Sequence, residues 1–181
     1  MAILKIARMG HPVLRRRADA VADPTAPAIR QLVADMIETM EDAPGLGLAA
    51  PQVHASLRIV IFHVPAARAA PGEPPAGLTV LINPEIEPLG PEQSLGWEGC
   101  LSVPELRGVV PRYDRIRYRG LDLDGAAIER EVSGMHARVV QHECDHLDGV
   151  LYPQRMGDLR LLIFTSEMRY FPAADGAEEA S

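Results

Sequence analysis

The segment His142-Glu143-Cys144-Asp145-His146 constrains the fold of this chain more than any other segment does. Its two histidines are four residues apart, so on an α-helix they lie on one face, one turn apart. Two imidazoles in this arrangement can bind a single cation, and Glu143 then lies close enough to exchange protons with a water on that cation. The segment therefore predicts a helix that supports metal-assisted hydrolysis, provided that a third ligand exists elsewhere.

The residues around this segment predict that the helix is buried on two faces. We expect it over residues 134–148, with Ser133 as its N-cap and Gly149 ending it in the left-handed conformation. Apolar residues share both the side of the histidines and the side opposite: Met135, Val139, Val140, Cys144 and Leu147. Buried histidines need polar partners, and a metal ion satisfies two at once, so this context disfavours the alternative of two surface histidines.

The chain has two cysteines that could supply the third ligand. Cys144 lies about 200° around the helix from each histidine and is expected to fill the core. Cys100 lies in a different setting, where Gly99 allows close approach of the backbone. A thiolate there would complete a Cys-His-His set with a fourth position open for water, which is the catalytic pattern. A lone cysteine is commonly a core residue, so spacing alone leaves both readings open.

The segment before residue 52 is rich in small residues and ends at Gln52, a neutral amide that could stabilise an oxyanion. Gly45 and Gly47 would let a substrate backbone approach, whereas a plain turn is the alternative. Helix geometry also places Met135, Arg138 and Val139 along the metal-facing side, where we expect substrate contacts. Met135 and Val139, with Leu46 from the loop, could form an apolar pocket for a methionine side chain. The apolar members could instead be core, and Arg138 is expected at the rim with its charge in solvent. Glu98 is expected either to bind the incoming peptide or to hold the Cys100 loop.

The rest of the chain predicts an α+β fold, with mainly antiparallel strands around the central metal-binding helix and an N-terminal helix. The first helix is expected to start at Asp23 as N-cap and Pro24, and to end by Ala43. Strands are expected at residues 57–64, 79–83 (stopped by Pro84), 86–89, 109–118 and 128–132, with a loop at 66–77 and an Asp124-Gly125 hairpin turn. Residues 160–170 fit either a short helix or a strand.

Composition limits the possible classes of function. The 181 residues predict one catalytic domain over residues 1–172 and a flexible acidic tail over 173–181. A net charge of −7 argues against a nucleic-acid partner, since the single basic run, at residues 15–17, is too short for a binding patch. Two cysteines, no secretory signal and no long apolar stretch predict a cytoplasmic protein without a membrane partner.

Three segments, taken together, resemble peptide deformylase. That family carries a Gly-x-Gly-x-Ala-Ala-x-Gln loop, a Glu-Gly-Cys-x-Ser segment and a Gln-His-Glu-x-Asp-His helix, in this order. Residues 45–52, 98–102 and 141–146 match them without departure at the defining positions. The resemblance extends from residues 10–14 to about residue 170, which is nearly the whole chain.

The resemblance implies a role for each matched residue. Cys100, His142 and His146 would hold the metal, and Glu143 would act as general base and acid. Gln52 and the backbone N–H of Leu101 would bind the oxyanion. The reaction would remove the N-formyl group from the initiator methionine of newly made polypeptides, releasing formate.

The resemblance also implies a cofactor and partners. One divalent metal ion is expected, with Fe(II) in the cell and Zn, Ni or Co able to occupy the site in purified protein. N-formylmethionyl nascent peptides are the expected partners, which implies transient proximity to the ribosome. The end of the sequence, Glu178-Glu179-Ala180-Ser181, is not basic, so we do not expect docking on the ribosome through it.

Two other readings of the metal motif stay open at this stage. A zinc metallopeptidase would hydrolyse internal amide bonds, but its third ligand would be a distant His or Glu in place of Cys100. A metal-binding module without catalysis would have a closed site, and neither Glu143 nor Gln52 would be needed there.

Overall fold

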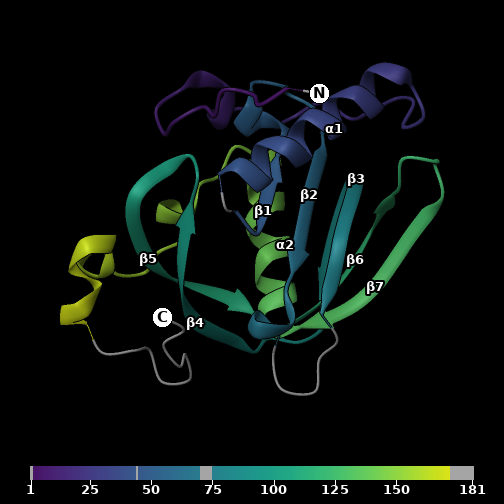
Figure 1. The fold of residues 1–181 in the computed structure, drawn as a ribbon. Coiled ribbons are helices and arrows are strands. Elements are labelled where there is room, and N and C mark those ends of the chain that lie inside the picture. The colour runs from purple at the N-terminus through teal and green to yellow at the C-terminus, as the bar shows by residue number, and fades with distance from the viewer. Residues whose placement is uncertain (1, 44, 70–74, 172–181) are drawn as a thin grey trace.

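The computed structural model describes residues 2–43, 45–69 and 75–171 (Figure 1). These residues contain two α-helices, α1 (Pro27–Asp42) and α2 (Gly134–Leu147). The strands within them are β1 (Gly47–Ala49), β2 (Ile59–Val64), β3 (Ala76–Pro88), β4 (Gln93–Cys100), β5 (Val103–Tyr113), β6 (Arg115–Leu121), β7 (Ala127–Ser133) and β8 (Ile163–Phe164). Short 3-10 helices connect them, among them η2 (Ala50–Val53), which carries Gln52, and η4 (Tyr152–Gln154).

The strands form two antiparallel sheets. One has the order β1-β2-β3-β6-β7, and the other has the order β4-β5-β8. Strands β1 and β4 are therefore edge strands. The predicted α+β class, with antiparallel strands around a central helix and an N-terminal helix, is confirmed.

Helix α2 lies at the centre of the molecule (Figure 1). Its face opposite the histidines packs against the five-stranded sheet through Val140, Cys144 and Leu147, which meet Val60 and Leu81 in one apolar cluster. Burial of both faces is confirmed, because every residue from Val139 to Leu147 is buried. Ser133 occupies the predicted N-cap position, although its side chain makes no capping hydrogen bond to the helix. Gly149 follows the helix with φ of +74°, as predicted.

Helix α1 covers the other face of the five-stranded sheet, where its stripe of Ile29, Val33, Met36 and Met40 packs against β1 and β2 residues. Its predicted start was wrong by one turn. Pro27 is the first helical residue, whereas the Asp23 carboxylate accepts hydrogen bonds from the backbone N–H and the hydroxyl of Thr25. An aspartate can cap such a local turn as readily as a helix, so its presence did not locate the helix start.

The strand predictions need two corrections. Residues 109–118 are not one strand. Asp114 separates β5 from β6, and these two strands belong to different sheets. Pro84 does not end its strand, since β3 continues to Pro88 with a register shift between Ile82 and Glu85. An irregularity of this kind accommodates a residue without a backbone N–H. The Asp124-Gly125 hairpin between β6 and β7 is confirmed.

Strand β4 was not predicted, although it carries Cys100. Part of the predicted loop at 66–77 is the 3-10 helix Ala66–Arg68 and the start of β3. The undecided segment at 160–170 holds β8 between two 3-10 helices, Leu159–Leu161 and Thr165–Tyr170. The predicted flexible tail at 173–181 lies outside the described residues, and a single domain over 1–172 stays a prediction. Among the described residues, no helix has both the length and the apolar character needed to cross a membrane.

Candidate metal centre and active site

The structure brings Cys100, His142 and His146 together at the centre of the molecule. One possible ligand atom from each lies within 4.8 Å of the other two, and Cys100 Sγ is 3.4 Å from His146 Nε2. The two imidazole rings are 5.0 Å apart at 87° because their residues are one turn apart on α2. Cys100 lies at the end of β4. The predicted triad therefore combines two residues of α2 with one residue of the three-stranded sheet.

The contacts of His142 fit a metal-binding role. Its Nδ1 atom is 2.8 Å from Glu98 Oε2, and a carboxylate can only accept, so Nδ1 carries the proton. The Nε2 atom is then left as the lone-pair donor toward Cys100 and His146. Burial alone raises the pKa of Glu98, but hydrogen bonds from His142 and Arg112 outweigh this and hold its pKa below the usual range. An ionised partner on Nδ1 fixes the ring in the tautomer that binding needs.

Glu143 follows His142 directly on α2. It is buried, and its Oε2 atom has no hydrogen-bond partner among the residues that the structure describes. Burial raises the pKa of this carboxyl group to about 7. A carboxyl oxygen that is buried, unpartnered and next to the metal-binding residues is suited to exchanging protons with a reactant.

Gln52 lies on η2, where its side chain is fixed at both ends. Its Oε1 atom accepts from the Ala49 N–H at 2.8 Å, and its Nε2 atom donates to Ser102 Oγ at 3.1 Å and Cys100 Sγ at 3.5 Å. The side chain is only 1% exposed. The amide N–H group is therefore held in place beside Cys100, and a donor fixed in this way can stabilise an oxyanion without reorganising.

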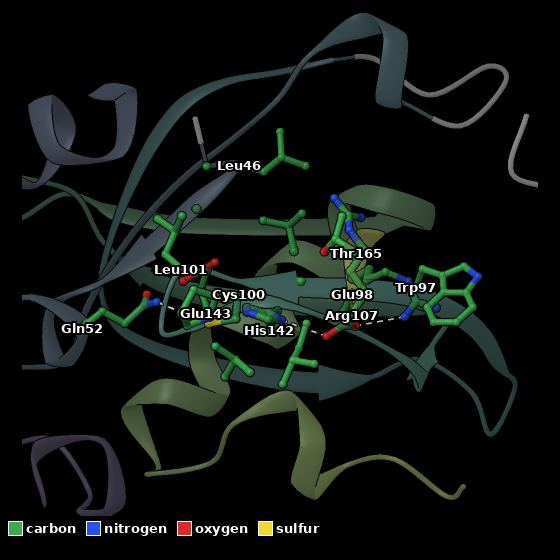
Figure 2. Close-up of a pocket in the computed structure, with 18 of the residues that line it drawn as sticks. Leu46, Gln52, Trp97, Glu98, Cys100, Leu101, Arg107, His142, Glu143 and Thr165 are labelled. Carbon is green, nitrogen blue, oxygen red and sulfur yellow. Dashed lines mark hydrogen bonds and ion pairs between the residues drawn. The ribbon is translucent and has the colours of Figure 1, made fainter. Parts of the chain in front are cut away.

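A cavity of about 470 Å³ opens over these residues. Figure 2 shows Gln52 and Leu101 at one side of His142 and Glu143, with Trp97 and Arg107 at the other. Of the residues predicted to bind substrate or act in catalysis, all line it: Gly45, Leu46, Gly47, Gln52, Glu98, Leu101, Met135, Arg138, Val139 and Glu143. The lining residues come mainly from β1 and the residues just before it, from β4, from β5 and from α2.

Sequence reasoning missed several residues of the cavity wall. Trp97, Arg107 and Thr165 line it, together with Arg68 from the 3-10 helix after β2. Thr165 comes from the segment after β8, more than 60 positions from Trp97 along the chain. No local pattern points to these residues, although Trp97 stands two positions before Gly99 on the strand that carries Cys100.

Two predicted roles change in the structure. The Arg138 charge is not in solvent, because its side chain is 11% exposed and donates to Glu98 Oε1 at 3.0 Å. The Glu98 carboxylate also lines the cavity, but the hydrogen bonds of both its oxygens go to His142, Arg112 and Arg138. It holds a metal-binding histidine instead.

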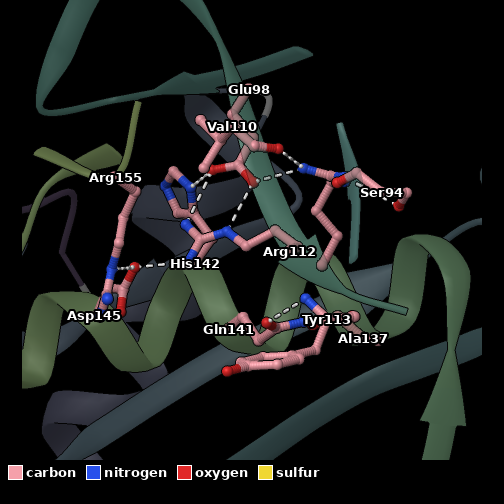
Figure 3. A network of polar contacts seen from close by, with 11 residues as sticks. Ser94, Glu98, Val110, Arg112, Tyr113, Ala137, Gln141, His142, Asp145 and Arg155 are labelled. Atoms are coloured by element: carbon pink, nitrogen blue, oxygen red, sulfur yellow. Dashed lines mark hydrogen bonds and ion pairs between the residues drawn. The ribbon is translucent and has the colours of Figure 1, made fainter. Parts of the chain in front are cut away.

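A buried chain of ion pairs runs from this carboxylate to the surface (Figure 3). Arg112 donates from Nε and Nη2 to the two oxygens of Glu98, and from Nη1 to Asp145 Oδ2 at 2.6 Å. Arg155, half-exposed, clamps both oxygens of Asp145. Sequence reasoning did not find this network, though a charged residue on a buried helix, Asp145, was the available signal.

The comparisons with known proteins agree with this site. The family model of polypeptide deformylase matches residues 3–161. Peptide deformylase 1 of Bordetella pertussis is 52% identical over 170 residues, which cover 94% of this chain and 96% of that protein. Peptide deformylase 1 of Nitrosomonas europaea is 47% identical over 177 residues, covering 98% and 99%.

Solved structures give the same result. A Met-Ala-Ser-bound class I type b peptide deformylase from Acinetobacter baumannii superposes with a TM-score of 0.79 at 39% identity, over 86% of this chain and 99% of that one. Peptide deformylase from Thermotoga maritima also gives 0.79, at 38% identity, over 87% and 100%. The chain therefore belongs to the polypeptide deformylase family and is a metal-dependent hydrolase that removes the N-formyl group from nascent peptides.

Proposed function

We propose that this deformylase binds the formylated end of a peptide in the cavity between β1 and β4, with the formyl group over Cys100, His142 and His146. The observation that carries the proposal is that two groups lie beside the same three residues: the fixed Gln52 amide, and the buried Glu143 carboxyl group, whose Oε2 atom has no hydrogen-bond partner in the described part of the chain. A proton-transfer group and an oxyanion donor on either side of a reacting carbonyl are what hydrolysis of an amide requires.

The peptide backbone is proposed to lie between the two free strand edges. Gly45, Leu46 and Gly47 line the cavity on the β1 side, and Trp97 and Gly99 line it on the β4 side. An edge strand has unpaired backbone donors and acceptors, which an extended peptide can complete. Gly47 also keeps the β1 wall close to Glu143, because it has no side chain to fill the space.

An apolar pocket for the methionine side chain is proposed at the α2 side of the cavity. Met135 lines it two turns before His142 and Val139 lines it one turn before, and Leu46, just before β1, also lines the cavity. A flexible thioether suits an apolar wall of this kind. A related deformylase, from Acinetobacter baumannii, was solved with Met-Ala-Ser bound, which is compatible with a methionine at this position.

The residues of the site are proposed to divide the proton and charge movements among them. Glu143 takes a proton from the attacking water and delivers a proton to the departing amine nitrogen. Gln52 Nε2–H and the backbone N–H of Leu101 donate to the oxygen that becomes negatively charged. Glu98 holds the proton on His142 Nδ1 throughout. When bound, a divalent cation supplies Lewis-acid chemistry, which polarises a carbonyl and lowers the pKa of a water.

The cation is proposed to be Fe(II) in the cell, with Zn, Ni or Co able to take its place in purified protein. One thiolate and two imidazoles are ligands that suit these late divalent metals. Elemental analysis of protein purified without air tests the assignment, with iron as the expected element. The nascent-chain substrate supports a cytoplasmic location with transient proximity to the ribosome.

Formate release tests the function directly. We expect formyl-Met-Ala-Ser to release formate in the presence of the metal-loaded protein, and an internally quenched peptide without a formyl group to stay intact. Glu143→Ala should keep the metal and lose about 100- to 10,000-fold in kcat, since it removes the proton-transfer group. Cleavage of the internal peptide would favour a metallopeptidase, and near-full activity of the variant would remove Glu143 from its role.

A further inference from the structure

Arg138 is one turn before His142 on α2 and buries its guanidinium among three elements. Nη1 donates to Glu98 Oε1 and to the Val110 carbonyl, both at 3.0 Å, and Nη2 donates to the Ser94 carbonyl at 2.9 Å. These partners lie on β4 and β5. Burying a cation is costly unless its hydrogen bonds are satisfied. These three hydrogen bonds satisfy the guanidinium, so Arg138 is a buried part of the structure and does not extend into solvent at the rim of the cavity.

The guanidinium of Arg138 lies against Gly96 on β4, which has no side chain. A Cβ atom built on Gly96 would be 2.8 Å from both Cζ and Nη2 of Arg138, closer than real Cβ contacts allow. Any other residue at this position would have to displace the guanidinium. Gly96 and Arg138 therefore form a matched pair that binds β4 to α2.

Glu98 connects this pair to the metal-binding residues. Its Oε1 atom accepts from Arg138 and from Arg112 Nε, while Oε2 accepts from Arg112 Nη2 and from His142 Nδ1. Arg112 and Arg138 thus hold the carboxylate from two directions (Figure 3 shows Ser94, Glu98, Arg112 and His142). Arg112 is itself fixed by Asp145, whereas Arg138 is the only one of the two that also lines the substrate cavity.

We propose that Arg138 is a positioning residue for the metal site. It fixes the Glu98 carboxylate, which in turn fixes the His142 ring with Nε2 toward Cys100 and His146. Partners that hold a metal-binding histidine typically change metal affinity by about 10- to 100-fold when removed. The inference rests on the assignment of His142 to the metal site, and it gives Arg138 a role apart from contact with the peptide.

The first experiment measures metal affinity and not turnover alone. We expect Arg138→Met to weaken Zn(II) binding, measured by chelator competition, by about 10-fold or more, and to alter the visible spectrum of the Co(II)-loaded protein. Arg138→Lys should recover part of the loss, because an ammonium keeps the charge but not the fork of donors. Arg117→Met is the matched control, since Arg117 pairs with Glu87, Glu129 and Glu131 on the surface of the other sheet. It should leave metal affinity unchanged.

A double-mutant cycle tests whether Arg138 acts through Glu98. In a Glu98→Gln background, we expect Arg138→Met to cause less than about a 2-fold further loss of metal affinity, because the two changes remove one interaction. Gly96→Ala should weaken metal binding in the wild type and have no further effect when combined with Arg138→Met. Independent, multiplying losses would overturn the inference. Should Arg138→Met not fold, by circular dichroism, Gly96→Ala and Arg138→Lys carry the same test.

His142→Ala separates this inference from the assignment on which it rests. Loss of metal from His142→Ala together with unchanged affinity in Arg138→Met and Gly96→Ala would overturn the Arg138 inference alone. Full metal binding by His142→Ala would overturn the metal site itself. The expected pattern is loss in His142→Ala and a graded loss through Arg138→Lys to Arg138→Met.

Discussion

Gly47 on β1 faces Glu143 on α2 so closely that a Cβ atom at position 47 would lie 2.6 Å from the carboxyl carbon of Glu143. The glycine therefore lets an edge strand lie directly over the side chain proposed to move protons. The same strand edge is where the peptide backbone is proposed to bind. In the proposed complex, this close approach sets the distance between the peptide and Glu143.

Gly47→Ala should lower kcat/KM for formyl-Met-Ala-Ser by about 10- to 100-fold, because either β1 or Glu143 must shift, and a displacement of about 1 Å is enough for such a loss. The metal content should not change. Gly77→Ala is the control, since Gly77 is also on a strand but a Cβ there meets nothing within 4 Å. Equal activity in both variants would mean that the approach of β1 to Glu143 has no role in turnover.

Gln52→Ala should lower kcat by about 100- to 1,000-fold with a small change in KM, as expected when one oxyanion donor worth about 2.7–4 kcal/mol is removed. The variant also loses the hydrogen bond from Ala49 N–H to Oε1. Gln154→Ala controls for that loss, because Gln154 Oε1 accepts from Leu151 N–H in the same way on η4. An equal fall in kcat in both variants would show that the loss in Gln52→Ala comes from the lost backbone hydrogen bond and not from an oxyanion donor.

His136 should make stability depend on pH below neutrality. Burial, with the nearby Arg130 charge, lowers its pKa from 6.5 to about 4. Between these values the unfolded chain takes up a proton that the folded chain does not, so the free energy of unfolding falls as the pH falls from 6.5 to about 4. His136→Gln removes this contribution. Urea unfolding of both proteins at pH 7 and pH 4.5 should show a smaller pH effect in the variant, and parallel curves would contradict the assignment.

Gly149→Ala should destabilise the fold more than Gly125→Ala does. Both glycines have positive φ, at +74° and +77°, which costs another residue about 1–2 kcal/mol. At Gly149 a Cβ would also lie 2.7 Å from the Arg15 carbonyl carbon, whereas at Gly125 the nearest atom is a Thr25 methyl carbon at 3.7 Å. Urea unfolding of the two variants measures the difference, and equal losses would show that the backbone at Arg15 yields without cost.

Local chemistry was enough to predict the helix that carries the site. The apolar residues on both faces of α2, its start after Ser133 and its end before Gly149 all lie within one segment of sequence. The same holds for the Asp124-Gly125 hairpin, whose turn depends on neighbouring residues alone. The three metal-binding residues were also predicted, though the choice of Cys100 over Cys144 drew on the helix angle and on the resemblance.

Features that depend on distant parts of the chain were predicted poorly. Residues 109–118 have continuous strand character, and nothing in them says that the part before Asp114 pairs with β4 while the part after it pairs with β3. Strand β4 contains Gly96 and Gly99, so it lacks an alternating pattern and forms as the hairpin partner of β5.

The network behind the metal site was beyond sequence reasoning for the same reason. Helix periodicity placed Arg138 on the metal-facing side, but it gave no information about how far its side chain is buried. Its burial follows from Gly96 and Ser94, about 40 residues earlier in the chain. Residues of β4 contact Arg138 only in the folded protein, so its burial cannot be read from the sequence around position 138.

X-ray absorption at the metal edge, on protein purified without air, tests the central claim most directly. The account predicts one sulfur and two imidazole nitrogens among the nearest ligands, with the sulfur absent from Cys100→Ser and one nitrogen absent from His146→Ala. A first shell without sulfur in the unaltered protein would contradict it.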